Sequence, residues 1–316
     1  MSIWLGLPAV VLFACACWAY TPDRSRAGLE TKYRVAPTDY VEVAGIRLHL
    51  RDTGPRNAPV LVLLHGFGSS LETWDAWADA LSGEYRVIRY DLPGFALTGP
   101  DPSGDYSEAR GMQVLAALLD RFGIARAMLI GNSIGGKLAW EFAARYPPRV
   151  DKLVLISPDG FASPGFEYGR KAEAPAWLGI MRITLPRVLV RMSLAPAYGD
   201  PEALTPATVT RYWDLMRAPG ARGAMVARLQ QTVLTDPEPD LRRIQAPTLL
   251  LWGERDGMIP VGNAADYQRD LPSCRLVVLP GLGHVPQEEA PAVALAPVLA
   301  FLRGAQDASS ASGSSP

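Results

Sequence analysis

The sequence predicts an α/β fold, namely a doubly wound, mostly parallel sheet with an inserted helical cap. Short apolar runs, typical of strands buried on both faces, alternate with helical segments over most of the chain. This alternation stops between residues 160 and 240, where prolines separate amphipathic pieces without a strand pattern. The chain has 316 residues, 48% of them hydrophobic and 20% charged, which suffices for one large domain and an inserted subdomain.

The first strands differ from the later ones because polar and apolar residues alternate in them. Residues 40–51 alternate around a turn at Gly45, which predicts a hairpin and places His49 on a strand surface rather than in a catalytic role. Continuous apolar runs then predict buried strands at residues 59–64, 86–90, 127–130, 150–156, 247–252 and 275–279. Helices are expected at residues 74–81, 110–122, 137–144, 262–271 and 292–302.

These elements divide the chain into a core and an insertion. The core is expected to comprise residues 38–158 and 241–303, and the helical cap residues 159–240. The amphipathic pieces of the cap are residues 177–190 and 209–216. Residues 304–316 are rich in Ser, Ala and Gly, which predicts a disordered tail.

An uncharged stretch precedes the core. Residues 2–20 are mostly apolar, and about 19 such residues can just span a bilayer as a helix. Because no basic residue precedes the run, a membrane anchor at residues 1–20 is favoured over a cleaved signal peptide or a lipoprotein signal. Four basic residues follow and would hold their side in the cytoplasm, which conflicts with export: Arg24, Arg26, Lys32 and Arg34. The protein is expected to be membrane-associated or exported, with the side of the membrane left open.

Charge and cysteine content narrow the choice of partners. The net charge is −1, from 31 basic and 32 acidic residues, so nucleic acid is not an expected partner. The three cysteines, Cys15, Cys17 and Cys274, form neither a zinc-binding pattern nor a disulfide framework. We expect no metal and no cofactor, and the sequence does not indicate an oligomeric state.

A Gly-x-Ser-x-Gly motif lies at residues 131–135, between an apolar run and a helical segment. A serine on such a strand-to-helix turn has an exposed hydroxyl and a strained backbone. Gly131 and Gly135 let strand and helix approach where a Cβ atom would clash. The start of the following helix presents free N–H groups beside the hydroxyl. The motif predicts that Ser133 is a nucleophile.

With four other features, this motif resembles the α/β-hydrolase family over roughly residues 38–303. In the family's order, the features are His65-Gly66-Phe67-Gly68, Asp91-Leu92-Pro93-Gly94-Phe95, the Ser133 motif, the Asp256 loop and the His284 loop. The resemblance implies the α/β-hydrolase fold and a catalytic triad of nucleophile, acid and histidine in that chain order. Ser133, Asp256 and His284 follow it.

Elementary chemistry selects the same histidine. A serine hydroxyl needs a base to attack an acyl carbon, normally a His whose ring is oriented by a carboxylate. The chain has three histidines. His49 falls within a strand, and His65 lies in a Gly-rich loop, where we expect it to fix the loop backbone by hydrogen bonds. His284 follows the last strand, at the edge where open α/β sheets bind ligands, and is predicted to be the base.

The acid has three candidates. Asp256 follows a buried strand and matches the family's Gly-x-x-Asp-x-x-x-Pro pattern, so it is the preferred residue. Glu254 lies two residues earlier, nearer the strand end. Asp159 follows the strand before the insertion, where some relatives carry the acid, and is the second choice.

Backbone N–H groups are expected to form the oxyanion hole. By resemblance, one belongs to Ile134, directly after the nucleophile, and the other to Phe67 in the loop after His65 and Gly66. The glycines on either side of Phe67 free this loop to turn its amide toward a substrate.

Three functions fit this pattern, because the fold alone does not determine the reaction. Carbon–carbon bond hydrolases of the family share the Gly-Asn-Ser-x-Gly-Gly motif, but they usually carry Gly-Pro-Gly after the first His-Gly and Trp after the catalytic His. This chain has Phe67-Gly68-Ser69 and Val285 there. We therefore expect a serine hydrolase that cleaves carboxylic esters of uncharged, apolar acyl or aryl substrates through an acyl-enzyme, with a carbon–carbon hydrolase of a vinylogous diketone as the alternative. A non-catalytic binding protein is the third possibility, although no triad position is broken.

Overall fold

A computed structural model describes residues 20–33, 35–162, 167–170 and 176–304. In these ranges eight strands form one sheet in the order β1-β2-β4-β3-β5-β6-β7-β8. β1 and β2 pair antiparallel, as do β2 and β4, and all later pairs are parallel. The strands are Tyr40–Val43, Ile46–Thr53, Val60–Leu64, Arg86–Tyr90, Ala127–Asn132, Val150–Ile156, Thr248–Gly253 and Cys274–Leu279. The predicted fold class is confirmed.

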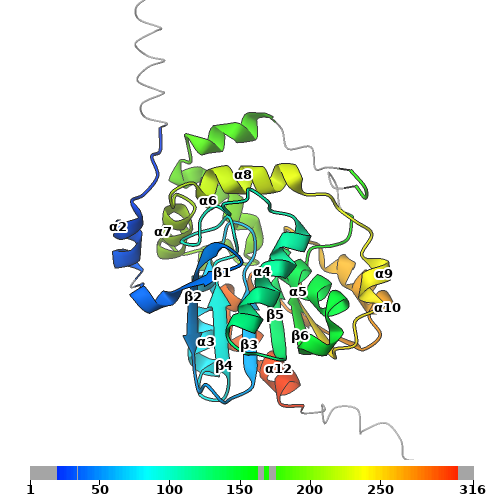
Figure 1. Cartoon of the computed structure of the whole chain (residues 1–316). Helices are drawn as coiled ribbons and strands as arrows, with labels where there is room; N and C mark the ends of the chain where they lie inside the picture. Colours follow the sequence, from blue (N-terminus) through cyan, green and yellow to red (C-terminus); the bar gives the residue numbers. More distant parts are fainter. Residues whose placement is uncertain (1–19, 34, 163–166, 171–175, 305–316) are drawn as a thin grey trace, which may run out of the picture.

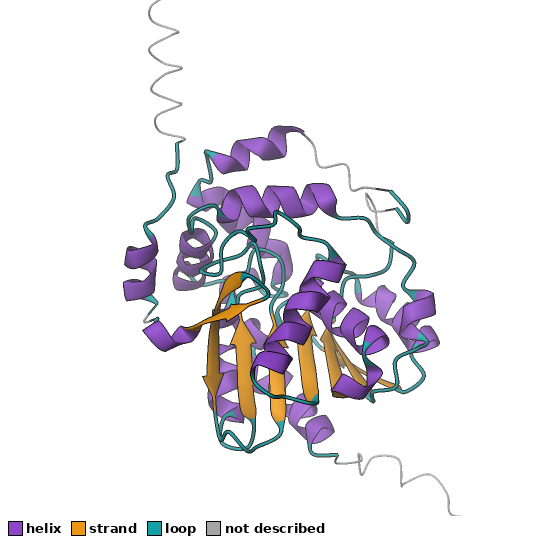
Figure 2. Ribbon diagram, viewed as in Figure 1, coloured by secondary structure: helices purple, strands orange, loops and turns teal. Residues whose placement is uncertain are grey.

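Helices cover both faces of the sheet. α4 and α5 lie on one face, and α3 and α12 lie on the other (Figures 1 and 2). The α-helices in the described ranges, α2 to α12 in order, are Arg26–Lys32, Asp75–Leu81, Glu108–Arg121, Ile134–Arg145, Arg187–Leu194, Pro206–Leu215, Ala221–Gln231, Glu238–Leu241, Ala264–Asp270, Pro286–Glu289 and Pro291–Leu302. This arrangement explains why the central strands are apolar at successive positions instead of alternating.

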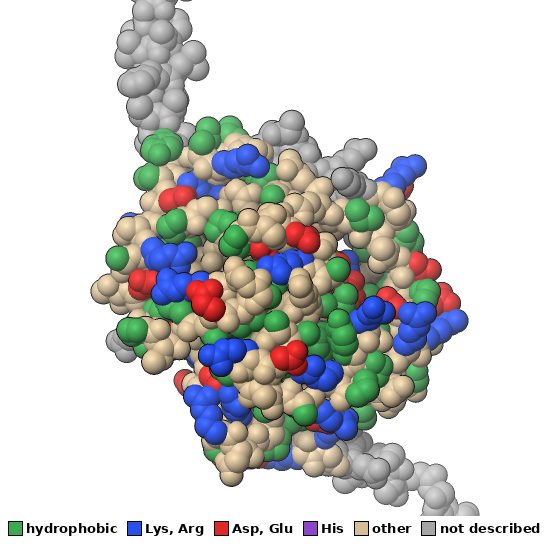
Figure 3. Space-filling view, viewed as in Figure 1, with side chains coloured by type: hydrophobic (Ala, Val, Ile, Leu, Met, Phe, Trp, Pro, Cys, Tyr) green, Lys and Arg blue, Asp and Glu red, His purple; other side chains and the backbone are tan. Residues whose placement is uncertain are grey.

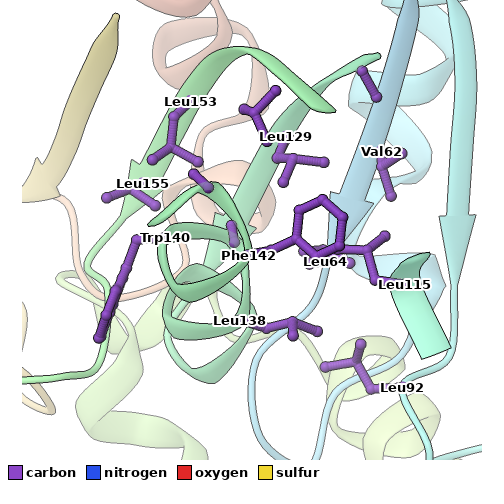
Figure 4. Packing of buried hydrophobic residues seen from close by; sticks show 14 of the residues in the cluster. Val62, Leu64, Leu92, Leu115, Leu129, Leu138, Trp140, Phe142, Leu153 and Leu155 are labelled. Carbon is purple, nitrogen blue, oxygen red and sulfur yellow. The ribbon is translucent and has the colours of Figure 1, made fainter. Parts of the chain in front are cut away.

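The core is divided by the sheet into two layers. In β3, Val62 and Leu64 face the layer that contains α4 and α5, whereas Leu61 and Leu63 face the layer that contains α3 and α12. Figure 4 shows the first layer, where Leu138 and Phe142 of α5 pack toward the sheet. The rigid sheet thus fixes the loops at the carboxyl ends of its strands.

The chain leaves the sheet after β6 and returns at β7, and of the intervening helices α6, α7 and α8 lie over the carboxyl ends of the parallel strands (Figures 1 and 2). The amphipathic piece predicted at residues 177–190 is divided into a 3-10 helix, Ala176–Arg182, and α6. Pro186 stands at the N-cap of α6, because proline suits the start of a helix but not its interior. The pairing of Tyr168 with Leu234 is an isolated bridge that the sequence pattern does not indicate.

The prediction that His49 lies on a strand surface is wrong. His49 is fully buried, and its Nδ1 atom lies 2.7 Å from Oδ2 of Asp91. The alternating pattern around His49 suggested a solvated face, but β2 lies between β1 and β4 and that face is covered. The partner carboxylate comes from the loop after β4, far away in sequence, so local periodicity could not reveal it.

The two terminal predictions concern mostly residues beyond the described ranges. The anchor predicted at residues 1–20 lies outside them except for Tyr20, and the tail predicted at 304–316 lies outside them except for Gly304. Within the described ranges, no helix combines the length and the apolar character needed to cross a membrane.

Candidate active site

Ser133 lies on the sharp turn that joins β5 to α5. Its backbone angles, φ 55° and ψ −122°, are unusual for a residue with a side chain and indicate stored strain. The turn is so tight that a Cβ atom on Gly131 would lie 2.2 Å from the carbonyl oxygen of Gly135, and one on Gly135 would lie 2.3 Å from that of Leu64. Only glycine fits at either position, so the turn is built around the serine.

Asp256 and His284 come together from the loops after β7 and β8. Nδ1 of His284 donates a hydrogen bond to Oδ2 of Asp256 over 2.8 Å. The other carboxylate oxygen, Oδ1, accepts the N–H groups of Met258 and Ile259, each at 2.8 Å. These two backbone bonds fix the position of the carboxylate, so the imidazole is held in one orientation.

The other two acid candidates lie elsewhere. Glu254 accepts a hydrogen bond from the N–H of Gly281 at 2.9 Å. Asp159 is half-buried beside the serine turn, where its N–H donates to the carbonyl oxygen of Ser133 at 3.1 Å. Burial raises the pKa of Asp159 despite the nearby Lys137 ammonium, so its carboxylate is poorly suited to stabilise an imidazolium.

The loop at residues 65–68 passes directly over the serine. A Cβ atom on Gly66 would lie 3.3 Å from Cβ of Ser133. His65 is fully buried, with Nδ1 donating to the carbonyl oxygen of Gly66 at 2.7 Å and Nε2 accepting the N–H of Leu92 at 2.9 Å. Burial lowers the pKa of His65, which keeps the ring neutral and suits this donor and acceptor pattern. Both ring nitrogens are therefore occupied in holding the loop.

Phe67 extends from this loop into a cavity of about 200 Å³. Its ring packs edge-on against Phe95, with centroids 5.3 Å apart. Ile134 is the first residue of α5, so its N–H has no carbonyl acceptor within the helix. The two amides predicted for the oxyanion hole thus come from segments that flank Ser133.

Ser133 and His284 both line the cavity, which is mostly apolar. Three methionines, Met181, Met216 and Met258, belong to its wall. The lining side chains in the described ranges include neither Lys nor Arg. Its other polar groups are hydroxyls and one amide, contributed by Ser69, Asn132, Ser193, Tyr198 and Tyr212.

Sequence reasoning missed two sets of residues that position the site. Nδ2 of Asn132, in the strand end before the nucleophile, donates to the carbonyl oxygen of His284 at 2.9 Å. The sequence signal that could have indicated this role is the position of Asn132 inside the Gly-Asn-Ser motif.

Two glutamates of α11 form the other set and connect the cap to the histidine loop. The Glu289 carboxylate accepts the N–H groups of Asp200 at 2.8 Å and Gly283 at 2.7 Å, one from the cap and one from the histidine loop. Glu288 accepts the hydroxyl of Tyr198 at 2.8 Å. No local pattern distinguishes these glutamates from surface residues.

A metal centre has no ready-made ligand set here. Across the residues that the structure describes, no group of three or more His, Cys, Asp or Glu side chains is placed to hold an ion.

Comparison with known proteins gives the chain its family. It is 32% identical over 268 residues to the dihydrolipoyllysine-residue acetyltransferase component of an acetoin cleaving system from Pseudomonas putida, covering 83% of this chain and 68% of that protein. It is 32% identical over 277 residues to a 2-hydroxy-6-oxononadienedioate/2-hydroxy-6-oxononatrienedioate hydrolase from Paraburkholderia phymatum, covering 82% and 93%.

Among solved structures, a bacterial membrane phospholipase A superposes with a TM-score of 0.74 at 27% identity, over 95% of this chain and 97% of that one. Residues 59–291 match the family model described as the alpha/beta hydrolase fold. The chain belongs to the α/β-hydrolase family.

Proposed function

We propose that the protein is a serine hydrolase that cleaves carboxylic esters of uncharged, apolar acyl or aryl groups through an acyl-enzyme. The observation that carries this proposal is the joint geometry of Ser133 and His284. A strained serine and a histidine already paired with Asp256 line one apolar cavity. Acyl transfer requires a nucleophile and a base that both face the space where a substrate binds, and these two residues line the same mostly apolar pocket.

Each residue of the proposed site then has one role. Nε2 of His284 takes the proton from the Ser133 hydroxyl as its oxygen attacks the ester carbonyl. The Asp256 carboxylate holds Nδ1–H and stabilises the imidazolium that forms. The N–H groups of Phe67 and Ile134 stabilise the oxyanion, and His284 returns the proton to the leaving alcohol. A water molecule, activated by the same histidine, then releases the acid.

The cavity wall supports an uncharged substrate. An anionic substrate would require a cation to compensate for the loss of its hydration, and the described lining side chains supply none. Apolar walls with a few hydroxyls suit an acyl chain whose ester group alone is polar. The likeness to a membrane phospholipase A supports a carboxylic ester as the substrate and also a membrane location through residues 1–20.

A carbon–carbon bond hydrolase is the second candidate. It is favoured by the 32% identity to a hydrolase whose name specifies a dioate, a substrate with two carboxylates. The charges of such a substrate would lie against the apolar wall described above. For this reason we prefer an ester hydrolase over a carbon–carbon bond hydrolase.

A chain-length series separates the candidates. Purified protein is given p-nitrophenyl esters from acetyl to octanoyl and, separately, a carboxylated vinylogous diketone, with Ser133→Ala as the background control. We expect kcat/KM to rise a few-fold per methylene, about 0.8 kcal/mol, until the cavity is full. Flat ester rates, or faster turnover of the diketone, would favour the carbon–carbon hydrolase. Absence of turnover on both, with no labelling by a serine-directed phosphonate, would favour a binding protein.

A further inference from the structure

Five large apolar side chains are exposed within residues 180–192 of the cap, and we call the exposed side of this segment the cap face. Their exposed fractions lie between 52% and 64%, and the residues are Ile180, Ile183, Val188, Leu189 and Met192. Exposed apolar residues are ordinary when scattered, but a cluster on neighbouring turns of one subdomain indicates an interaction surface. Figure 3 shows hydrophobic side chains grouped at the top of the molecule, above the sheet.

The cap face includes one side of α6. Val188, Leu189 and Met192 fall within one helical face, whereas Val190 points the opposite way and is buried. The helix therefore has two apolar sides, one against the cap interior and one toward solvent. Packing among the described residues accounts for the first side but not for the second.

Cations flank this apolar surface. Arg182, Arg187 and Arg191 are all exposed, and Glu202 is the acidic side chain that shares a surface hollow with the latter two. Two guanidinium groups are fixed by backbone carbonyls: that of Arg187 by Pro206 and that of Arg191 by Leu204, each at 2.8 Å. Apolar side chains bordered by Arg are typical of surfaces that lie in the headgroup region of an anionic bilayer.

The described chain begins beside this face. The N–H of Thr21 donates to the carbonyl oxygen of Ile183 at 3.0 Å, and Oγ1 of Thr21 accepts the N–H of Leu185 at 3.1 Å. Residues 2–19, which directly precede this contact in the sequence, contain no charged side chain. An uncharged and mostly apolar segment of the sequence is thus joined to the molecule at the edge of the exposed apolar surface.

We propose that the cap face is a membrane-docking surface that rests on an anionic lipid bilayer, beside the point where residues 1–19 join the fold. The apolar side chains contact the acyl region near the headgroups, and the three arginines contact lipid phosphates. This proposal concerns binding to lipid and does not depend on the ester chemistry proposed above.

Docking in this way would bring the cavity close to the lipid. Met181, Ser193 and Leu194 line the cavity, and they are adjacent in sequence to the cap-face residues Ile180 and Met192. The same short helices therefore form the inner wall of the cavity and the outer apolar surface. A substrate dissolved in the bilayer would need to travel only a short distance.

Site-specific fluorescence on the full chain tests this proposal. Cys15, Cys17 and Cys274 are replaced by Ser, and a nitrobenzoxadiazole label is attached through Met192→Cys. The matched control is Val293→Cys, because Val293 is 59% exposed and lies on α12, outside the cap. The labelled proteins are reconstituted into phosphatidylglycerol and phosphatidylethanolamine vesicles with or without spin-labelled lipid. Thermal unfolding of each protein is compared with that of the natural chain.

The proposal predicts that, on vesicles, the emission of the label at position 192 is blue-shifted and is mostly quenched by spin-labelled lipid. The label at position 293 is quenched only by aqueous iodide. If iodide quenches both labels and lipid neither, the cap face is in water and the proposal fails. If neither quencher reaches position 192, another copy or residues 1–19 cover the face, which also overturns it. If the protein does not float with the vesicles, the proposal is also overturned. The readout needs no turnover, so it is independent of the outcome of the ester assay.

Discussion

Two His–Asp pairs in this molecule have almost the same geometry but different surroundings. His49 and Asp91 approach to 2.7 Å, and His284 and Asp256 approach to 2.8 Å, in both cases through Nδ1 and Oδ2. Exposure does not distinguish them strongly, since all four residues are at most 8% exposed. The difference lies in the other contacts of each pair.

The His49 pair is enclosed by structural bonds. Oδ1 of Asp91 accepts the N–H of Leu71 at 2.8 Å, and Oδ2 accepts that of Leu97 at 3.0 Å. In the described part of the chain, Nε2 of His49 has no hydrogen-bond partner. Burial alone would lower the pKa of His49, but the Asp91 carboxylate outweighs burial and raises it. This pair fastens the loops after β3 and β4.

The His284 pair, by contrast, opens onto the cavity that Ser133 also lines. An imidazole oriented by a carboxylate is therefore not sufficient evidence of catalysis. What separates the two pairs is access of the second ring nitrogen to a nucleophile and to a space for substrate. The predictions that follow test this difference, from the largest expected effect to the smallest.

Replacing the carboxylate of the cavity pair should have the largest effect. Asp256→Asn should lower kcat by about 10⁴-fold, because the amide no longer fixes the imidazole tautomer. Melting temperature and the KM for an ester should change little. Asp159→Asn is the matched control and should keep most of the activity. A greater loss of kcat from Asp159→Asn would show that the acid has been assigned to the wrong loop.

The same change in the enclosed pair should affect stability instead. Asp91→Asn should lower the free energy of unfolding by about 3–5 kcal/mol, since it leaves His49 buried without its charged partner. Urea denaturation measures this loss, and kcat per folded molecule should stay within a few-fold of the natural protein. Unchanged stability together with a large loss of kcat would contradict the structural role of this pair.

A smaller, pH-dependent effect is expected at the neighbouring Glu72. Burial, reinforced by the Asp91 charge, raises the pKa of its carboxyl. A raised folded-state pKa means that the stability contributed by this group is present at low pH and is lost as pH rises above the unfolded value near 4.3. Glu72→Gln removes this dependence, so its stability advantage over the natural chain should grow from pH 4 to pH 7, to on the order of 1 kcal/mol. Thermal melts across this range measure it, and a constant difference would count against it.

The fold was largely predictable because its signals are local. The apolar runs at β3, β6 and β7 need cover on both faces, and this requirement determines the α/β class. The predicted ends of the helices were less accurate than the predicted fold class. Ile134, directly after Ser133, begins α5 three residues before the predicted start at 137, because the strained turn itself supplies the N-cap position.

The site was predictable only where a motif carried it. Ser133, Asp256 and His284 follow a chain order that chemistry and resemblance both suggest; in the structure Ser133 and His284 line one cavity, and Asp256 is hydrogen-bonded to His284. The roles of Glu289 and His49 depend on partners many residues away, at Asp200 and Asp91, and no local pattern reports such pairs.

Labelling by a p-nitrophenyl alkylphosphonate tests the central claim most directly, because the reagent modifies a serine only when a base activates it. The account predicts one adduct on Ser133, found by peptide mass spectrometry, in the natural protein and in Asp91→Asn. It predicts none in Ser133→Ala and much slower labelling in Asp256→Asn, with folding of each variant checked by circular dichroism. An adduct on another serine, or equal labelling rates in Asp256→Asn and the natural protein, would contradict the account.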